Sequence, residues 1–321
     1  MKAIEFKTTG NLDHLQYVEM EEPKIQPHEV FIKVLAAGLN KSDTTNVMGL
    51  FPYTTVPRVP GRDYSGVIEK GPKDLLGIEV FGTGKEIGFT QNGAHAQYLC
   101  LDANAICIKP KEISHQQAAS LGVPYITAYF AVENTRIQKD SKVVIIGASG
   151  AVGFAASLLA KQKGANVLCI LRNEAKAHSL EQLGLKTELI NQDSQLETLV
   201  TKHFKGGADV VFDTTGIWIS QSISALATYG RLACIVVPGD GNVKVSIRDL
   251  YRVGGEIIGV NSLLYSAKQC AQVFNKLLPG FKNGDLLSSP DLAFHPLSEA
   301  PTLYKKLRGG ETGKIILLPH S

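Results

Sequence analysis

Residues 142–172 have the pattern of a strand, a glycine turn, a buried helix and a second strand, and this order constrains the fold more than any other stretch. Lys142 to Ile146 is a β-branched run without alternation, as expected of a parallel strand covered on both faces. Gly147, Gly150 and Gly153 follow at once. In such a turn the first glycine supplies conformational freedom, the second lets backbone approach a phosphate, and the third brings helix and strand together.

The helix expected from about Ala151 to Lys163 is small or apolar through Ala160, which leaves its N-terminal amides free for an anion. A glycine triplet alone is weak evidence, because glycine-rich turns close many strands. Here the preceding strand, the helix and the strand Asn166 to Leu171 all stand where a dinucleotide-binding βαβ unit requires them. The residues expected at the pyrophosphate are Gly147, Ser149, Gly150, Ala151, Val152 and Gly153.

Composition limits the function classes open to the chain. Its 321 residues exceed the usual size of a single core, so two domains are expected. The net charge is +3 without a block of like charge, which disfavours nucleic acid as a partner. The five cysteines are scattered without a CxxC pair, as in reduced, cytoplasmic proteins. The N-terminus has no apolar signal segment and glycines interrupt each long apolar run, so no membrane span is expected.

Residues 1 to about 122 predict a mostly β domain. The strands expected there include 3–6, 16–19 and 30–37. The prolines of the stretch from Asn40 to Gly71 forbid regular structure for much of its length, and its aromatic residues favour an ordered segment that carries a site. From about Ile113 the pattern becomes helical, and Pro124 is expected in the first turn of a helix.

Strands and helices then alternate over about 120 residues, which predicts a doubly wound parallel sheet and an α/β fold class. The helices expected are 174–183, 194–203 and 217–228. The strands expected are 187–190, 208–212, 231–237 and 255–260. The remainder contains an amphipathic helix at 267–278 and ends in the strand GKIILLP.

Taken in order, the motifs AAGLNKSD, VPGRDYSGVIE, ASLGVPYITAY, GASGAVG and GKIILL resemble those of the medium-chain dehydrogenase/reductase superfamily. Within it the chain is most similar to the zinc-free quinone oxidoreductase branch, which includes ζ-crystallin. The resemblance implies a GroES-like catalytic domain at 1–122 and 263–321 and a Rossmann dinucleotide-binding domain at 123–262. It also implies cofactor and substrate in the cleft between the domains.

Zinc-dependent relatives hold their catalytic metal at positions that correspond to Asn40, Arg62 and Val123. An amide, a guanidinium and an isopropyl group are not zinc ligands, so no metal site is expected. If this pocket is buried, Arg62 needs a partner. Asp43 and Asp63 are the nearest candidate partners in sequence. We expect an ion pair with Asp43 in place of the metal, and an exposed, unpaired Arg62 is the alternative.

The choice of dinucleotide depends on the end of the second strand of the βαβ unit. An acid there favours NAD, whereas a cation without the acid favours the phosphorylated form. Arg172 can bind a phosphate with two hydrogen bonds, Lys176 follows one turn later, and Asn173 is expected to cap the next helix. Glu174 keeps NAD open, but it also suits a helix start. The cofactor predicted is NADPH, bound in part by Arg172, Asn173 and Lys176.

The resemblance implies further contacts with the cofactor. Thr127 and Tyr129 are expected near the nicotinamide, and Thr127 is counted among the catalytic residues. The other cofactor-binding residues expected are Thr215, Val237, Pro238, Asn261 and Lys314.

Without a metal, the hydride acceptor must itself stabilise negative charge, as quinones and α,β-unsaturated carbonyls do. Asn40 is the candidate donor to the developing oxyanion or to the cofactor ribose, and a turn-stabilising role after Gly38 is its alternative. Bacterial quinone reductases tend to carry a tyrosine in the segment after the Asn motif, where this chain has Thr45 and Phe51. Tyr53 is therefore the catalytic phenol proposed, while Tyr64 favours packing.

The leading interpretation is an NADPH-dependent oxidoreductase that transfers a hydride to quinones or enones without zinc. The resemblance implies a homodimer joined through edge strands of the Rossmann domain. An enoyl-thioester reductase is a second reading, weakened because Phe51 cannot donate a proton. A low-turnover NADPH-binding structural or redox-sensing protein is a third, because the glycine turn reports binding and not chemistry. The histidines, including His95, have no constellation around them and are expected to serve structure or surface.

Overall fold

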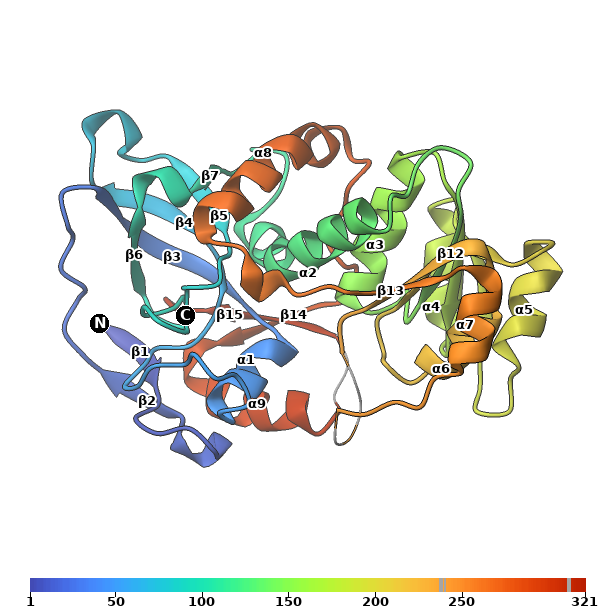
Figure 1. Cartoon of the computed structure of the whole chain (residues 1–321). Helices are drawn as coiled ribbons and strands as arrows, with labels where there is room; N and C mark the ends of the chain where they lie inside the picture. The colour runs from blue at the N-terminus through green and yellow to red at the C-terminus, as the bar shows by residue number, and fades with distance from the viewer. Residues whose placement is uncertain (237–238, 240, 311–312) are drawn as a thin grey trace. The chain divides into compact units, whose positions relative to one another are not determined.

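The computed structural model describes residues 1–236, 239, 241–310 and 313–321 and divides the chain into two compact units (Figure 1). Unit 1 is Met1–Ile126 with Ser262–Ser321, and unit 2 is Thr127–Asn261. The sequence placed the boundaries at 122/123 and 262/263. The first contact boundary falls inside the continuous helix α2 (His115–Asn134), which offers no break in secondary structure to mark it.

Unit 1 is mostly β. Its main sheet has the order β14-β15-β3-β4-β5-β7, with β6 also paired to β3, and β1 and β2 form a separate pair. The strands are β1 (Lys2–Glu5), β2 (Gln16–Glu19), β3 (Glu29–Leu39), β4 (Asp63–Lys70), β5 (Glu79–Gly82), β6 (Tyr98–Asp102), β7 (Cys107–Ile108), β14 (Leu292–Pro296) and β15 (Lys314–Leu318). Strand β3 lies in the middle of this sheet, as its nearly continuous apolar sequence predicts.

Helices complete unit 1. They are α1 (Lys41–Val47), the first part of α2, α8 (Ala267–Asn283) and α9 (Ala300–Arg308). The apolar face of α9 packs on the sheet through Leu303 and Tyr304. The C-terminal strand β15 pairs antiparallel with β3, which inserts the end of the chain into the sheet of its first half.

Unit 2 is a six-stranded parallel sheet of order β10-β9-β8-β11-β12-β13. Its strands are β8 (Lys142–Ile146), β9 (Asn166–Leu171), β10 (Lys186–Leu189), β11 (Ala208–Asp213), β12 (Leu226–Cys234) and β13 (Glu256–Gly259). Counted along the unit, this is the 3-2-1-4-5-6 order of the doubly wound Rossmann sheet, so the predicted α/β class is confirmed. The strand order reverses between β8 and β11, and ligands of open parallel sheets bind beyond the carboxyl ends of the strands at such a point.

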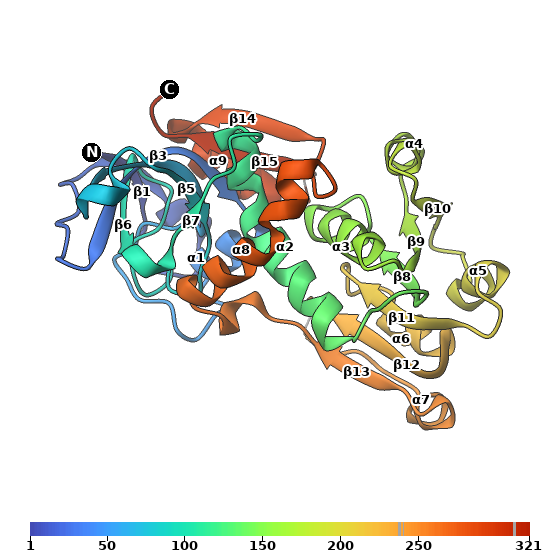
Figure 2. The ribbon, with the colours of Figure 1, turned by 90° about the horizontal axis from the view of Figure 1, so that it is seen from above.

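Helices connect the strands of unit 2. They are α3 (Ala151–Gln162), α4 (Glu174–Gln182), α5 (Leu196–His203), α6 (Ile219–Ser224) and α7 (Ile247–Val253), and the end of α2 also belongs to this unit. Helix α3 packs on β8 and β9, and α6 packs on β11 and β12 (Figure 2). The core is formed mainly by apolar strand residues such as Val144 and Ile170, which are fully buried.

Three local features differ from the predictions. The stretch from Asn40 to Gly71 is irregular over 48–62, as expected, but Lys41–Val47 is helical, because Asp43 accepts the backbone N–H of Asn40 and helps to cap a short helix. Pro124 lies inside α2, since that helix already begins at His115. Helix α6 ends at Ser224, because the chain from Leu226 pairs with β11 instead.

Among the described residues, no helix combines the length and the apolar character that crossing a bilayer demands.

Candidate functional site

Of the three glycines in the turn after β8, only Gly150 leaves room for a ligand. Gly147 has φ +78°, and a Cβ there would lie 2.5 Å from Thr214 Oγ1. A Cβ on Gly153 would lie 2.3 Å from the Gly147 carbonyl. At Gly150 the nearest atom to an added Cβ is the Gly147 oxygen at 3.4 Å, an ordinary contact. Gly147 and Gly153 are thus required by the fold itself, whereas the space at Gly150 is open to a ligand.

Gly150 is also the N-cap of α3, and it has no side chain with which to cap the helix. Ser149, Ala151 and Val152 around it are partly exposed. The first backbone N–H groups of the helix therefore face a small, uncapped turn at the switch point of the sheet. These residues fit a pyrophosphate, as the sequence predicts for this turn.

The end of β9 carries the predicted cation. Arg172 is exposed and, within the described part of the chain, has no hydrogen-bond or ion-pair partner. Asn173 Oδ1 accepts the backbone N–H of Lys176 at 3.0 Å, which confirms Asn173 as the N-cap of α4. Glu174 lies exposed in the first turn of α4, where a negative charge is favourable.

The turn after β11 is organised by a buried carboxylate that the sequence analysis did not single out. Asp213 is fully buried, and its Oδ1 accepts the Thr215 N–H at 2.8 Å and the Thr215 hydroxyl at 2.7 Å. Asp213 Oδ2 accepts the Trp218 N–H at 2.8 Å. The Thr215 hydroxyl therefore donates inward to the turn.

The other predicted residues of unit 2 are placed as follows. Thr127 is buried in α2, with 5% of its surface exposed, and Asn261 is exposed at the end of the unit. Val237 and Pro238 lie outside the described residues.

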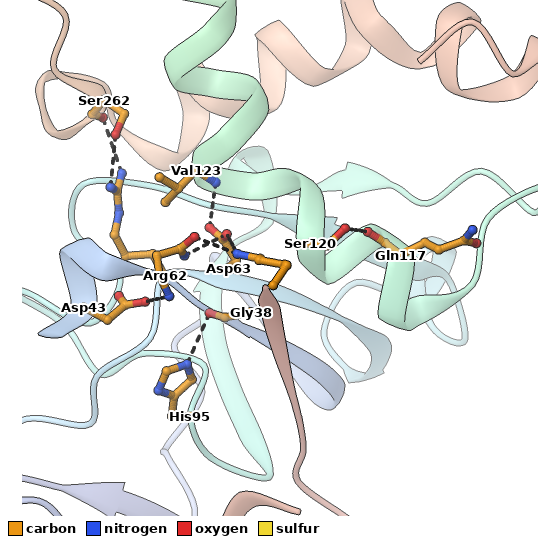
Figure 3. A network of polar contacts seen from close by, with 11 residues as sticks. Gly38, Asp43, Arg62, Asp63, His95, Gln117, Ser120, Val123 and Ser262 are labelled. Atoms are coloured by element: carbon orange, nitrogen blue, oxygen red, sulfur yellow. Dashed lines mark hydrogen bonds and ion pairs between the residues drawn. The ribbon is translucent and has the colours of Figure 1, made fainter. Parts of the chain in front are cut away.

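In unit 1, Asn40 lies at the end of β3 in a buried polar cluster with Asp63 and Lys314. Its Nδ2 donates to Asp63 Oδ2 at 2.9 Å, and its Oδ1 accepts from Lys314 Nζ at 2.6 Å. Lys314 Nζ also lies 3.3 Å from Asp63 Oδ2. Asp63 Oδ1 accepts the backbone N–H of Val123 at 2.8 Å (Figure 3). We call Asn40, Asp63 and Lys314 the Asn40 cluster.

The cluster joins three elements that are distant in sequence. Gly122 makes the approach possible, because a Cβ there would lie 2.1 Å from Asp63 Oδ1. Sequence reasoning assigned Lys314 to the cofactor and gave Asp63 no role beyond a possible partner of Arg62. The available signal was a lone lysine before a buried apolar strand, GKIILL, because such a lysine needs a carboxylate.

Both expectations for Arg62 were wrong. The side chain is fully buried rather than exposed, and it makes no ion pair with Asp43 or any other carboxylate among the described residues. Instead its guanidinium donates to the carbonyl of Gly84 at 3.0 Å and to Ser262 Oγ at 3.2 Å. Figure 3 shows the side chain directed toward Ser262. These neutral oxygens accept the guanidinium hydrogen bonds that the expected ion pair with Asp43 would have used.

Asp43 is fully buried in α1 beside this cluster. Its Oδ2 accepts the Asn40 N–H at 2.8 Å, whereas Oδ1 has no hydrogen-bond partner in the described part of the chain. Burial, with Asp63 nearby, raises the pKa of Asp43 to about 7, although Arg62 and Lys314 act in the opposite direction. This carboxyl therefore titrates in the neutral range.

Tyr53 belongs to an aromatic group with Phe51 and Phe89. The Tyr53 ring lies 5.9 Å from Phe51 and 5.8 Å from Phe89, measured between centroids. Tyr53 is 37% exposed, and partial burial raises the pKa of its phenol, which therefore stays protonated at neutral pH. Tyr64 is fully buried in the core, as a packing residue should be.

His95 has the structural role that was expected of it. It is fully buried between the Gly38 carbonyl, 3.3 Å from Nε2, and the Tyr304 hydroxyl, 2.8 Å from Nδ1. Burial lowers the pKa of His95 to about 4. The neutral ring can then donate from Nε2 to the carbonyl and accept from Tyr304 at Nδ1.

The residues at the expected metal positions do not fit zinc. Asn40 uses its amide within the Asn40 cluster, Val123 contributes only a backbone N–H, and Arg62 offers donors without lone pairs. No group of three or more His, Cys, Asp or Glu residues that could hold a metal occurs in the described ranges.

Two family models match the chain. The one described as "Alcohol dehydrogenase GroES-like domain" matches residues 26–112, and the one described as "Zinc-binding dehydrogenase" matches residues 151–278.

Relatives match over most of the chain. A zinc-type alcohol dehydrogenase-like protein of Schizosaccharomyces pombe is 34% identical over 84% of this chain and 80% of its own length. The quinone oxidoreductase of Homo sapiens is 28% identical over 99% of this chain and 98% of its own. Among solved structures, a quinone oxidoreductase of Pseudomonas syringae pv. Tomato DC3000 superimposes with a TM-score of 0.86 at 23% identity, covering 99% of each chain.

Proposed function

The chain belongs to the medium-chain dehydrogenase/reductase family, and from this premise we propose that it is an NADPH-dependent reductase of quinones or α,β-unsaturated carbonyl compounds that works without zinc. The observation that carries the proposal is the replacement of a metal-ligand set by Asn40, Arg62 and Val123, whose side chains or backbone make other bonds. Without a Lewis acid, the acceptor must be one that stabilises negative charge by itself. Quinones and conjugated carbonyls meet this condition.

The preference for NADPH is supported by the end of β9. Arg172 stands exposed there and without a partner among the described residues, so it can take the 2′-phosphate with two hydrogen bonds. The glycine turn would hold the pyrophosphate on the N–H groups of α3. When bound, the reduced nicotinamide supplies a hydride, and the acceptor takes up that hydride together with one proton from water.

Asn40 and Tyr53 are the proposed groups for the acceptor. The Asn40 amide can donate a hydrogen bond to the oxygen on which negative charge develops. Tyr53 offers a protonated phenol and, with Phe51, an aromatic surface against which a flat ring can stack. Neither the Asn40 amide nor the protonated Tyr53 phenol acts as a base, which agrees with a reaction that depends on positioning and hydrogen bonding.

The test is NADPH oxidation with phenanthrenequinone, benzoquinone, an alkenal and crotonyl-CoA as acceptors. We expect turnover with a quinone or the alkenal, and loss of most of it in Asn40→Ala. Preference for crotonyl-CoA would instead identify an enoyl-thioester reductase. Tight NADPH binding without turnover of any acceptor would refute the proposal in favour of a binding protein.

We also propose that the protein is a homodimer joined through the outer edge of the sheet of unit 2. Strand β13 is the last strand of that sheet, and Ile257 on it is 41% exposed. Tyr229 and Tyr251 in the neighbouring elements are 73% and 69% exposed. An open strand edge with apolar side chains around it favours pairing with a second copy.

A further inference from the structure

The side chain of Asn40 is held at both ends of its amide. Lys314 donates to Oδ1 at 2.6 Å, and Nδ2 donates to Asp63 at 2.9 Å. We propose that Lys314 and Asp63 are positioning residues, which lock the Asn40 carboxamide in the one orientation that presents an N–H to the oxygen of the hydride acceptor. This inference rests on the role of Asn40 proposed above and extends it to two residues that act through Asn40.

The chemistry of the two partners fixes the orientation. An ammonium has donors only, and an ionised carboxylate has acceptors only. If the Asn40 amide flipped, its NH₂ group would face the Lys314 ammonium and its carbonyl would face the Asp63 carboxylate. Both contacts would be repulsive, so the observed orientation is the only one that satisfies the cluster.

One donor of Asn40 remains for a ligand. Nδ2 carries two hydrogens, and Asp63 is its acceptor within the described part of the chain. An amide that could rotate freely would also present its oxygen, which repels a developing oxyanion. The cluster therefore makes Asn40 a donor in every molecule, and this is preorganisation of the kind that stabilises a transition state.

The partners are themselves held in place. The side chains of Lys314 and Asp63 are 4% and 0% exposed. The second oxygen of Asp63 is occupied by the Val123 N–H at 2.8 Å, so the carboxylate cannot turn away from Asn40. The backbone N–H of Asn40 is fixed by Asp43 at 2.8 Å. A buried ion pair is weak evidence for stability, since desolvation offsets much of its attraction. The role that we assign to this ion pair is therefore to orient Asn40, not to stabilise the fold.

This role differs from direct binding of the cofactor by Lys314, which the family resemblance implies. A lysine that contacts the cofactor should affect NADPH affinity when it is removed, independently of Asn40. A positioning lysine should affect turnover, and only while Asn40 is present.

The experiment is a double-mutant cycle with Lys314→Met, Asn40→Ala and the double variant, each checked by circular dichroism. Lys109→Met is the matched control, because Lys109 has the same side-chain exposure of 4% and pairs with Glu79 at 3.0 Å, without contacting the Asn40 cluster.

For Lys314→Met we expect kcat with benzoquinone to fall by about 10-fold or more, with the dissociation constant of NADPH unchanged. The double variant should be no slower than Asn40→Ala, and Lys314→Arg should regain part of the loss. Additive losses in kcat, or weaker NADPH binding in Lys314→Met, would overturn the proposal.

A second measurement does not need turnover. Selective ¹⁵N labelling of asparagine gives side-chain NH₂ signals, and the Asn40 pair is the one lost in Asn40→Ala. In the unmodified protein and in Lys109→Met, we expect two well-separated proton signals that exchange slowly with water. In Lys314→Met, or in Lys314→Gln if the first variant does not fold, they should converge and exchange faster. If no acceptor is reduced, the proposed function fails and this spectrum alone decides: an Asn40 signal indifferent to Lys314 would refute the positioning role.

Discussion

The buried carboxyl of Asp43 makes the stability of unit 1 depend on pH in a direction opposite to that of most aspartates. Its pKa is about 7 in the folded chain, against an ordinary value of 3.8. Between these values the folded state holds a proton that the unfolded state has released. The free energy of unfolding therefore falls as pH rises from about 4 to 7, and the loss is complete above that range.

The magnitude follows from the two pKa values. Each pKa unit corresponds to about 1.4 kcal/mol, so the difference between the two pKa values lowers the free energy of unfolding, relative to its value in acid, by roughly 2 kcal/mol at pH 5 and about 4 kcal/mol at pH 8. Asp43→Asn removes this titration, while its amide oxygen can still accept the Asn40 N–H. The cost of the new unpaired NH₂ group is the same at both pH values. We therefore expect the variant, measured relative to the unmodified protein, to gain about 2–3 kcal/mol between pH 5 and pH 8.

The assay is urea unfolding at both pH values, followed by far-UV circular dichroism. Fluorescence of Trp218, the only tryptophan, reports on unit 2. His95, whose pKa is lowered to about 4, destabilises the fold as pH falls below 6.5, but it does so equally in both proteins. A difference between the proteins that is flat from pH 5 to pH 8 would refute the assignment of the titration to Asp43.

The remaining predictions concern the cofactor and the assembly. Gly150→Asp should abolish NADPH binding with little change in melting temperature. Gly153→Ala should lower the melting temperature, because its Cβ would lie 2.3 Å from the Gly147 carbonyl. Thermal scans with and without NADPH measure both effects, and equal destabilisation by the two variants would contradict the separate roles of the two glycines. Arg172→Ala should raise the KM for NADPH at least about 10-fold more than that for NADH, because a charged hydrogen bond to the 2′-phosphate is lost, and equal effects on the two cofactors would remove Arg172 from this role. Ile257→Lys should convert a dimer into a monomer in light scattering coupled to size-exclusion chromatography, and an unchanged mass would exclude the β13 edge.

The sequence predicted the dinucleotide-binding half of the molecule closely. The strands Lys142–Ile146 and Asn166–Leu171 and the cap at Asn173 occur where they were expected. These features are local, because a β-branched run, a glycine turn and a capping residue act on backbone within a few residues of themselves. The parallel sheet then follows from the alternation of helices and strands.

The Asn40 cluster depends instead on contacts between distant residues. Asn40 and Lys314 are 274 positions apart, and Arg62 binds Ser262 across 200 positions. No local pattern reports such pairings, so Arg62 was expected to pair with Asp43, an acid in the same segment of the chain, and the partners of Lys314 were not predicted. Only the tertiary structure, by placing β15 beside β3 and α2 over Asp63, decided which charges meet. The sequence by itself determined that the chain has a dinucleotide turn, because that turn is built from neighbouring residues. Which groups surround Asn40 was decided by folding, because burial forces each charged group to find a partner wherever the chain brings one.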